Sequence, residues 1–241
     1  MRAPVRRTGV VAERNCLSME SFISIFERAA ERKGGASNLE KLLVKPKSAA
    51  ALADLRDAEV LAEMTRCVFR SGFVWRVIEN KWPAFETAFD QFDVTTCALL
   101  SDEALEGMQR NSAIVRHASK IASVRRNAQY LLAVRAEHGS YGRFLAEWPA
   151  TDFVDLWHEL KLHGDRLGGQ TGRYFLRFIG RDTPLLSNDV VAALQIQGVI
   201  DKAPSSQRAL RTVQAAFNVW REESGRSYNE ISRVLAMSVP D

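Results

Sequence analysis

The chain has 241 residues, enough for one large domain or two small ones with a buried core. Hydrophobic residues make up 46% of it and charged residues 26%, which is ordinary for a water-soluble globular protein, and the formal net charge is +4. No apolar run approaches the roughly 20 residues of a membrane helix, and the N-terminal stretch lacks the apolar segment of a secretory signal. We therefore expect a cytoplasmic protein that does not bind membranes.

Helical periodicity runs through the chain, whereas strand-like alternation is nearly absent. A first amphipathic helix is expected over 18–32, and Ser37 with Glu40 forms a capping-box pattern before the next helix. A helix from about Asp57 is interrupted at Gly72 and resumes, and Pro83 is expected to open a further short helix. The remaining expected helices begin at Ser101, cover 117–135, 151–162, 171–179, 187–197 and 205–223, and begin at Ser227, where Glu230 completes a capping box.

This pattern predicts an all-α fold that is compact and two-lobed. We expect a mobile basic tail over residues 1–17 and a single helical domain over residues 18–241. Neither repeats nor low-complexity segments divide the domain further.

Positive charge is concentrated in two stretches. Residues 110–143 contain seven Arg and Lys side chains against one acidic residue, and residues 161–181 contain five against one. Concentrated basic charge in a nearly neutral chain favours a polyanionic partner such as nucleic acid. Solvated helix faces also carry Arg and Lys, so the charge alone leaves that alternative equally open.

The cysteines and histidines do not form a metal-binding pattern. The three cysteines are odd in number and widely spaced, which argues against a disulfide framework. His158 and His163 are five residues apart, whereas a zinc protease helix needs histidines four apart. We expect neither a metal nor a cofactor.

Gly168, Gly169 and Gly172 lie close together in the segment GDRLGGQTGRYFLRF, where one predicted helix gives way to the next. A tight turn at Gly168 and Gly169 leaves backbone amides at the start of the next helix, where the helix dipole favours an anion. Glycine has no Cβ, so a phosphate can approach the backbone. This is the physics of a helix-hairpin-helix, which holds a DNA phosphate without reading the sequence. Thr171, Gly172 and Arg173 complete the segment, but the glycines alone favour a plain turn.

An aspartate follows about twenty residues later, at the start of the apolar helix SNDVVAAL. Asp189 alone is more often a simple helix cap than a functional carboxylate. A hairpin followed at this distance by an aspartate resembles the DNA glycosylases of the helix-hairpin-helix superfamily.

The upstream segments 71–93 and 111–131 make the resemblance more specific. Together with the hairpin they resemble the DNA-3-methyladenine glycosylase I family over roughly residues 58–195. The matching positions are Gly72, Phe73, Trp75, Phe89, Phe92, Asp93, Ile114, Arg116, His117, Lys120, Ile121, Asn127 and Ala128.

The resemblance implies a role for individual residues. Asp189 would be the catalytic carboxylate, and the base-binding pocket would contain Trp75, Cys67, Phe69 and Phe73. Arg116, His117 and Lys120 would contact DNA phosphates together with the hairpin residues Gly168, Gly169, Thr171, Gly172 and Arg173. The alternatives are core packing for Trp75, Phe69 and Phe73, a solvated face for the basic residues and a buried histidine for His117.

Two departures from the family pattern matter. The family has a zinc site, but Val190 and Leu194 stand at two of its ligand positions, so zinc is not expected. The family's base-recognition glutamate falls on Cys67, and a thiol is a poor substitute for a carboxylate that binds a cationic base.

The resemblance therefore implies a monofunctional DNA N-glycosylase. It would flip a 3-methyladenine-like alkylated base out of double-stranded DNA and hydrolyse the N-glycosidic bond, acting as a monomer. One alternative is a DNA-binding protein on the same scaffold without glycosylase activity. A third is a helical interaction protein whose basic stretches never contact nucleic acid.

Overall fold

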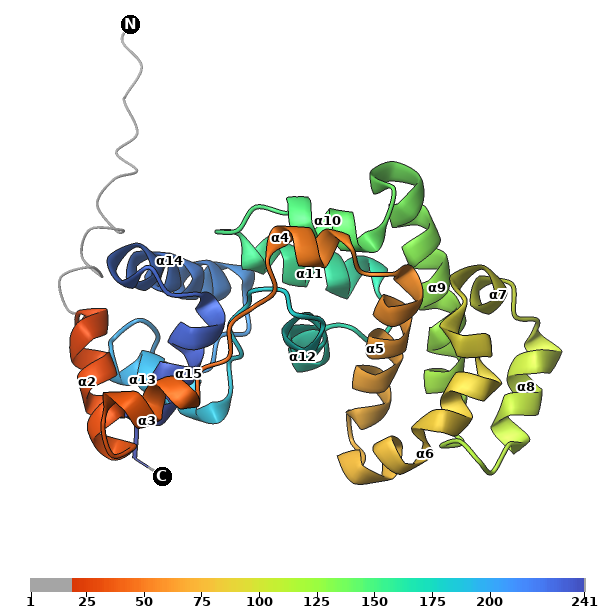
Figure 1. Ribbon diagram of the computed structural model, residues 1–241, viewed down its shortest axis with the longest axis horizontal. Coiled ribbons are helices and arrows are strands. Elements are labelled where there is room, and N and C mark those ends of the chain that lie inside the picture. Colours follow the sequence, from red (N-terminus) through yellow and green to blue (C-terminus); the bar gives the residue numbers. More distant parts are fainter. Residues whose placement is uncertain (1–18, 241) are drawn as a thin grey trace, which may run out of the picture. The chain divides into compact units, whose positions relative to one another are not determined.

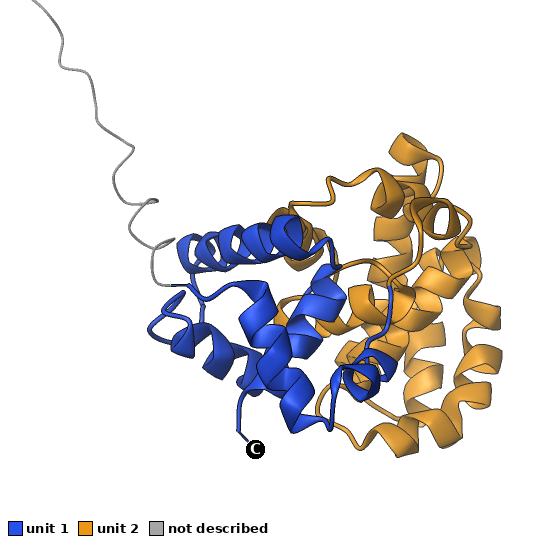
Figure 2. Cartoon of the chain, turned by 60° about the vertical axis from the view of Figure 1, so that its left-hand side comes forward, with its two compact units in different colours: residues 1–45, 184–241 blue, residues 46–183 orange. Residues whose placement is uncertain are grey.

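The computed structural model describes residues 19–240, and every regular element among them is helical (Figure 1). The predicted all-α fold class is confirmed for this part of the chain. The expected basic tail lies outside the described residues. The chain divides into two compact units, one formed by residues 1–45 and 184–241 and the other by residues 46–183 (Figure 2).

Unit 1 brings the two ends of the chain together. Its helices are α2 (Phe22–Arg32), α3 (Ala36–Lys41), α13 (Asn188–Ile196), α14 (Gln207–Ser224) and α15 (Tyr228–Ser238). α15 packs on α2 and α13, so the N-terminal helix completes a core that the C-terminal helices begin. The fully buried Trp220 fastens the two ends, because its indole Nε1 donates to the carbonyl of Glu20 at 3.2 Å.

Unit 2 contains the segment between these ends. Its helices are α4 (Ala49–Ala53), α5 (Asp57–Arg70), α6 (Trp75–Ala88), the 3-10 turn η1 (Asp90–Phe92), α7 (Val94–Ala98), α8 (Asp102–Arg110), α9 (Ala118–His138), α10 (Tyr141–Glu147), α11 (Phe153–His163) and α12 (Gly169–Ile179). The long helix α9 packs against α5, α7, α8 and α10, and α5 also packs against α12. Two helices far apart in sequence, α5 and α12, therefore lie side by side (Figure 1).

Serine caps fix several helix starts close to where the sequence predicts them. Ser101 accepts a hydrogen bond from the amide of Ala104, and Ser187 accepts one from Val190. Ser227 and Glu230 form the predicted capping box. A capping bond spans only three residues, which makes it readable from local sequence.

Two local predictions were wrong. α6 runs continuously from Trp75 to Ala88 with Pro83 inside it, so no new helix opens there. The buried residues Trp82 and Phe85 lie on either side of the proline with stacked rings 5.5 Å apart, and this packing continues across the missing backbone bond. Ser37 lies within α3, whose N-cap is Gly35, and it makes no capping bond.

No helix of the described residues is both long and apolar enough to cross a membrane.

Candidate functional site

A tight turn joins α11 and α12 where the glycines predict it, and α12 begins two residues earlier than expected, at Gly169. Asn127 of α9 holds this turn from the side. Its side-chain nitrogen donates to the carbonyl of Asp165 at 3.1 Å, and its oxygen accepts from the amide of Asp165 at 2.7 Å. Arg126 donates from Nε to the Asp165 carboxylate at 2.6 Å. The turn is therefore fixed to the longest helix of the unit.

The glycines of this segment serve different structural needs. A Cβ at Gly172 would lie 2.1 Å from the carbonyl oxygen of Leu167, so only glycine fits there. Gly169 has a φ of +60°, and a Cβ built there would have no neighbour within 4 Å. Gly168 is the N-cap residue of α12 and has no side chain with which to cap it. An uncapped helix start with open space beside it is suited to an external anion.

The two arginines that flank the turn differ in exposure. Arg166 is exposed, with a φ of +63°, and its Nη2 donates to Ser119 at 2.7 Å. Arg173 lies over the Trp157 ring, 4.1 Å from its centroid, and burial lowers the pKa of its guanidinium to about 10. Arg173 therefore packs against the protein, and Arg166 is the arginine exposed at the turn.

A pocket of about 210 Å³ lies where α12 packs against α5. Pockets for drug-sized ligands are larger, at roughly 300–1,000 Å³, so this one suits a single small ring system. Its lining residues come from the end of α5, the following turn, the start of α6 and one face of α12: Cys67, Arg70, Ser71, Gly72, Trp75, Gln170, Thr171, Tyr174 and Phe178. All of them belong to unit 2.

Aromatic rings form much of the pocket wall. Trp75 meets Tyr174 and Phe178 edge to face, with ring centroids 5.8 and 5.9 Å apart. Tyr174 and Phe178 are stacked on each other at 5.6 Å. Trp75 is 45% exposed and Phe178 42% exposed, so large parts of both rings remain open to a ligand. Such surfaces favour a flat aromatic ligand.

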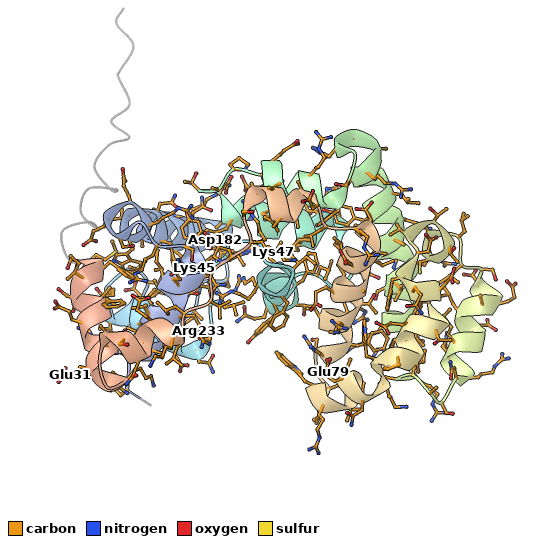
Figure 3. All side chains as sticks on the ribbon, in the orientation of Figure 1. Glu31, Lys45, Lys47, Glu79, Asp182 and Arg233 are labelled. Carbon is orange, nitrogen blue, oxygen red and sulfur yellow. The ribbon has the colours of Figure 1, made fainter. Side chains whose placement is uncertain are left out.

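The charged side chain in the pocket lining is Arg70. Its guanidinium lies 5.0 Å from the ring centroid of Trp75 and 5.2 Å from that of Phe178. Nε and Nη2 donate to Glu79 of α6 at 3.0 and 2.8 Å, and Nη1 lies 3.7 Å from Glu63. Figure 3 shows the position of Glu79 on α6. Two carboxylates thus hold this arginine on the aromatic wall.

Cys67 lines the pocket as a neutral thiol. Burial raises the pKa of this thiol, and the nearby Glu63 carboxylate raises it further. The Sγ atom donates to Glu63 Oε1 at 3.5 Å. Glu63 also accepts a hydrogen bond from Arg66 at 3.0 Å. The negative charge of Glu63 is therefore paired with an arginine, and Cys67 itself carries no charge.

The two phenylalanines expected in the pocket do not line it. Phe69 is completely buried and packs edge to face on Phe85 at 4.6 Å, which makes it a core residue. Phe73 is partly exposed in the turn before α6, where its ring lies 6.4 Å from that of His117. The alternative of core packing is therefore correct for Phe69.

The three basic residues before α9 have separate environments. Arg116 is exposed, and His117 is the half-buried N-cap residue of α9, with Nδ1 3.2 Å from the Ser119 hydroxyl. Lys120 is only 5% exposed, and its ammonium donates to the carbonyls of Phe69 and Ser71. Burial, with a smaller contribution from a nearby arginine, lowers the pKa of Lys120. Lys120 therefore holds the turn that lines the pocket and is not placed to contact a phosphate.

Asp189 lies in the first turn of α13 in unit 1 and is exposed. Ser187, not Asp189, caps this helix, since its side chain accepts from the amide of Val190. The plain capping role is thus taken by another residue, and a catalytic role for Asp189 stays a prediction.

The positions at which the resemblance implies zinc ligands do not fit a metal. Val190 and Leu194 are apolar and buried in unit 1. Within residues 19–240, no three His, Cys, Asp or Glu side chains gather as a metal ion would require.

The sequence interpretation missed most of the pocket wall. The predicted pocket residues do not include Arg70, Tyr174 or Phe178, which line it. Tyr174 and Phe178 are four residues apart and so share a helix face. The spacing of Glu63, Arg66 and Arg70 along α5 is likewise typical of an ion-pair network on one helix face. Neither pattern shows which helix lies opposite.

The chain is similar to several solved structures of DNA glycosylases. One is 3-methyladenine DNA glycosylase I from Staphylococcus aureus, with 22% identity over 54% of this chain and 80% of that chain and a TM-score of 0.47. Another is a variant of 3-methyladenine DNA glycosylase I in complex with 3-methyladenine, with 20% identity over 63% of this chain and 89% of that chain and a TM-score of 0.49.

Residues 52–161 match the family model described as methyladenine glycosylase. This stretch begins in α4, contains α5 to α10 and most of α11, and includes the Cys67 to Trp75 side of the pocket. The match covers just under half of the chain, and over this stretch the chain is similar to the methyladenine glycosylase family.

Proposed function

We propose that the protein is a monofunctional DNA N-glycosylase that removes an alkylated base from double-stranded DNA. One observation carries the proposal beyond the family match. The first turn of α12 supplies both the uncapped helix start and the pocket residues Gln170 and Thr171. A phosphate held at this helix start would therefore bring a flipped nucleotide beside the aromatic pocket.

The DNA backbone would be held without sequence readout. Gly168 and Gly169 offer backbone amides at a positive helix end, and Thr171 adds a hydroxyl in the same turn. The exposed Arg166 and Arg116 would neutralise neighbouring phosphates, while His117 stays a further candidate. Because each phosphate contact releases counterions, binding would weaken with salt for any DNA sequence.

The flipped base would enter the pocket and stack on Trp75. This ring is half exposed and is supported by Tyr174 and Phe178, so it presents a rigid face. Base–aromatic stacking contributes about 1–3 kcal/mol, which offsets part of the few kcal/mol that extrusion from the duplex costs.

Hydrolysis breaks the bond between C1′ and the base nitrogen. The electron pair leaves with the base, water adds its hydroxyl to C1′, and the water's second hydrogen is released as a proton or taken up by the base. We assign to Asp189 the stabilisation of the positive charge on the sugar, or the orientation of the attacking water. The pocket is lined within unit 2 alone, so the proposed reaction needs no second copy, and we propose that the chain acts as a monomer.

The test compares Asp189→Asn with Asp201→Asn, the same change at another exposed aspartate of unit 1. Wild type and Asp201→Asn should release free bases from alkylated duplex DNA, whereas Asp189→Asn should release none and still bind DNA. Release by Asp189→Asn at the wild-type rate would remove its catalytic assignment. DNA binding by wild type without release of any base would favour the non-catalytic DNA-binding protein.

A further inference from the structure

The aromatic face of the pocket already carries a cation. The guanidinium of Arg70 lies near the centroids of both Trp75 and Phe178, at 5.0 and 5.2 Å. These are distances at which a cation gains from the electrons of a ring. Any ligand that stacks on the open part of these rings lies beside this arginine, and a cationic ligand is repelled by it.

The neighbouring carboxylates do not offer a cationic ligand a free partner. Glu79 accepts two hydrogen bonds from Arg70 and lies 3.9 Å from Arg66, and Glu63 pairs with both arginines. Neither glutamate lines the pocket, whereas Arg70 does. The lining residue Cys67 is a neutral thiol that itself donates to Glu63. A ligand in the pocket therefore meets a positive group before it meets a negative one.

Arg70 also has hydrogen-bond donors to spare. Its hydrogen bonds use Nε and Nη2, both to Glu79, and Nη1 lies beyond hydrogen-bond distance from Glu63, at 3.7 Å. The two hydrogens of Nη1 make no hydrogen bond within the part of the protein that the structure describes, and an acceptor atom on the edge of a base could accept them. The two bonds to one carboxylate oxygen fix the guanidinium in place for such a contact.

We propose that Arg70 selects a neutral base with acceptor atoms on its edge and disfavours cationic N-alkylated purines. The proposal rests on the proposed function only in taking the pocket as the site of a flipped base. Neutral alkylated purines such as ethenoadenine fit this description, and 3-methyladenine in DNA, which carries a positive charge, does not.

The reaction gives the same arginine a second role. A cationic base leaves as a neutral molecule and needs little help. A neutral base leaves with the electron pair of the C1′–N bond and so becomes negatively charged until it takes the proton that the attacking water gives up. The Arg70 cation beside the ring would stabilise that charge as it develops.

The first experiment measures base release under single-turnover conditions from two duplexes, one containing ethenoadenine and one containing 3-methyladenine. Relative to the uncatalysed loss of each base, wild type should accelerate the release of ethenoadenine about tenfold or more beyond that of 3-methyladenine, the factor expected for one charge-assisted hydrogen bond. Arg70→Gln should lose this preference and Arg70→Lys should retain part of it. Arg66→Gln is the matched control, because Arg66 pairs with the same glutamates but lies over Trp82 and does not line the pocket.

Release of 3-methyladenine alone by wild type would overturn the inference and leave the proposed function intact. Equal loss of preference in Arg66→Gln would also overturn it, because the effect would then belong to the ion-pair network. If wild type releases neither these two bases nor any base from alkylated duplex DNA, the proposed function fails, and equilibrium binding decides the inference. Binding is then measured by the quenching of tryptophan fluorescence with free nucleosides. Ethenodeoxyadenosine should quench at concentrations about tenfold below those needed for a deoxyadenosine methylated at a ring nitrogen. Equal binding of the two nucleosides would contradict our proposal.

Discussion

Substituting Gly172 with alanine tests whether the hairpin depends on a close backbone approach. A Cβ at this position would lie 2.1 Å from the carbonyl oxygen of Leu167, although such contacts are not found below about 3 Å. Relief requires a shift of roughly 1 Å between α12 and the turn. Leu167 is 1% exposed and Asp165 is bonded to Asn127, so neither side of the contact moves freely.

Overpacking of this kind costs about 1–3 kcal/mol. For a chain of this length each kcal/mol shifts the midpoint of thermal unfolding by about 2–4 °C, so Gly172→Ala should lower it by about 2–12 °C. The same distortion displaces the uncapped start of α12, and affinity for undamaged duplex DNA should fall as well. Circular dichroism and fluorescence anisotropy measure the two effects.

Gly107→Ala is the matched control. Gly107 lies exposed inside α8, and a Cβ built there has no neighbour within 4 Å. Alanine is favoured over glycine in a helix by about 1 kcal/mol, so this variant should unfold at a higher temperature than wild type and bind DNA unchanged. If Gly172→Ala also unfolds at or above the wild-type temperature, the close approach does not shape the hairpin.

Three further predictions follow from exposure and charge. Arg166→Glu should weaken binding to any duplex DNA and reduce the slope of log affinity against log salt concentration by about one phosphate contact. Arg173→Met should leave this slope unchanged. Equal slopes for the two variants in a filter-binding titration would contradict the prediction. Cys67 should react with iodoacetamide far more slowly in the native protein than in guanidinium chloride, because burial raises the pKa of its thiol, and equal rates by mass mapping would refute its burial. The hydrogen bond from Arg28 lowers the pKa of Glu20 below its ordinary value of 4.5. The small stabilisation that this ion pair gives the folded state is therefore present above pH 4.5 and is lost as the pH falls through the lowered pKa. Glu20→Gln should flatten the pH dependence of urea unfolding in that range, and an unchanged slope would show that the pair contributes nothing.

The sequence predicted features that depend on a few neighbouring residues. Helix starts at Ser101, Ser187 and Ser227 follow from bonds that span three residues. The turn before α12 was predicted for the same reason, although the need for Gly172 was not. That need comes from the carbonyl of Leu167 five residues earlier, which approaches only after the turn has formed.

Features that depend on packing between distant segments were not predicted. Lys120 was expected to contact a DNA phosphate, with a solvated face as the alternative, yet it donates to carbonyls at the end of α5, about fifty residues earlier. Continuity of α6 through Pro83 likewise depends on the buried rings around Trp82. The pocket wall formed by Tyr174 and Phe178 needs the contact between α5 and α12, for which the sequence holds no local signal.

Position 67 shows how the contrast between local and packing-dependent features affects the prediction of which base is bound. Taken alone, Cys67 in place of a glutamate is the loss of a carboxylate. In the structure, Cys67 lies one turn after Glu63. This glutamate accepts a hydrogen bond from the Cys67 thiol and pairs with Arg66 and Arg70. A glutamate at 67 would place two like charges four residues apart on α5 and would compete with Glu79 for Arg70. The thiol avoids that repulsion and leaves Glu79 to hold Arg70 on the aromatic wall. The thiol at position 67 is therefore one part of an arrangement that gives the pocket a cation, and in our proposal the choice of base depends on Arg70.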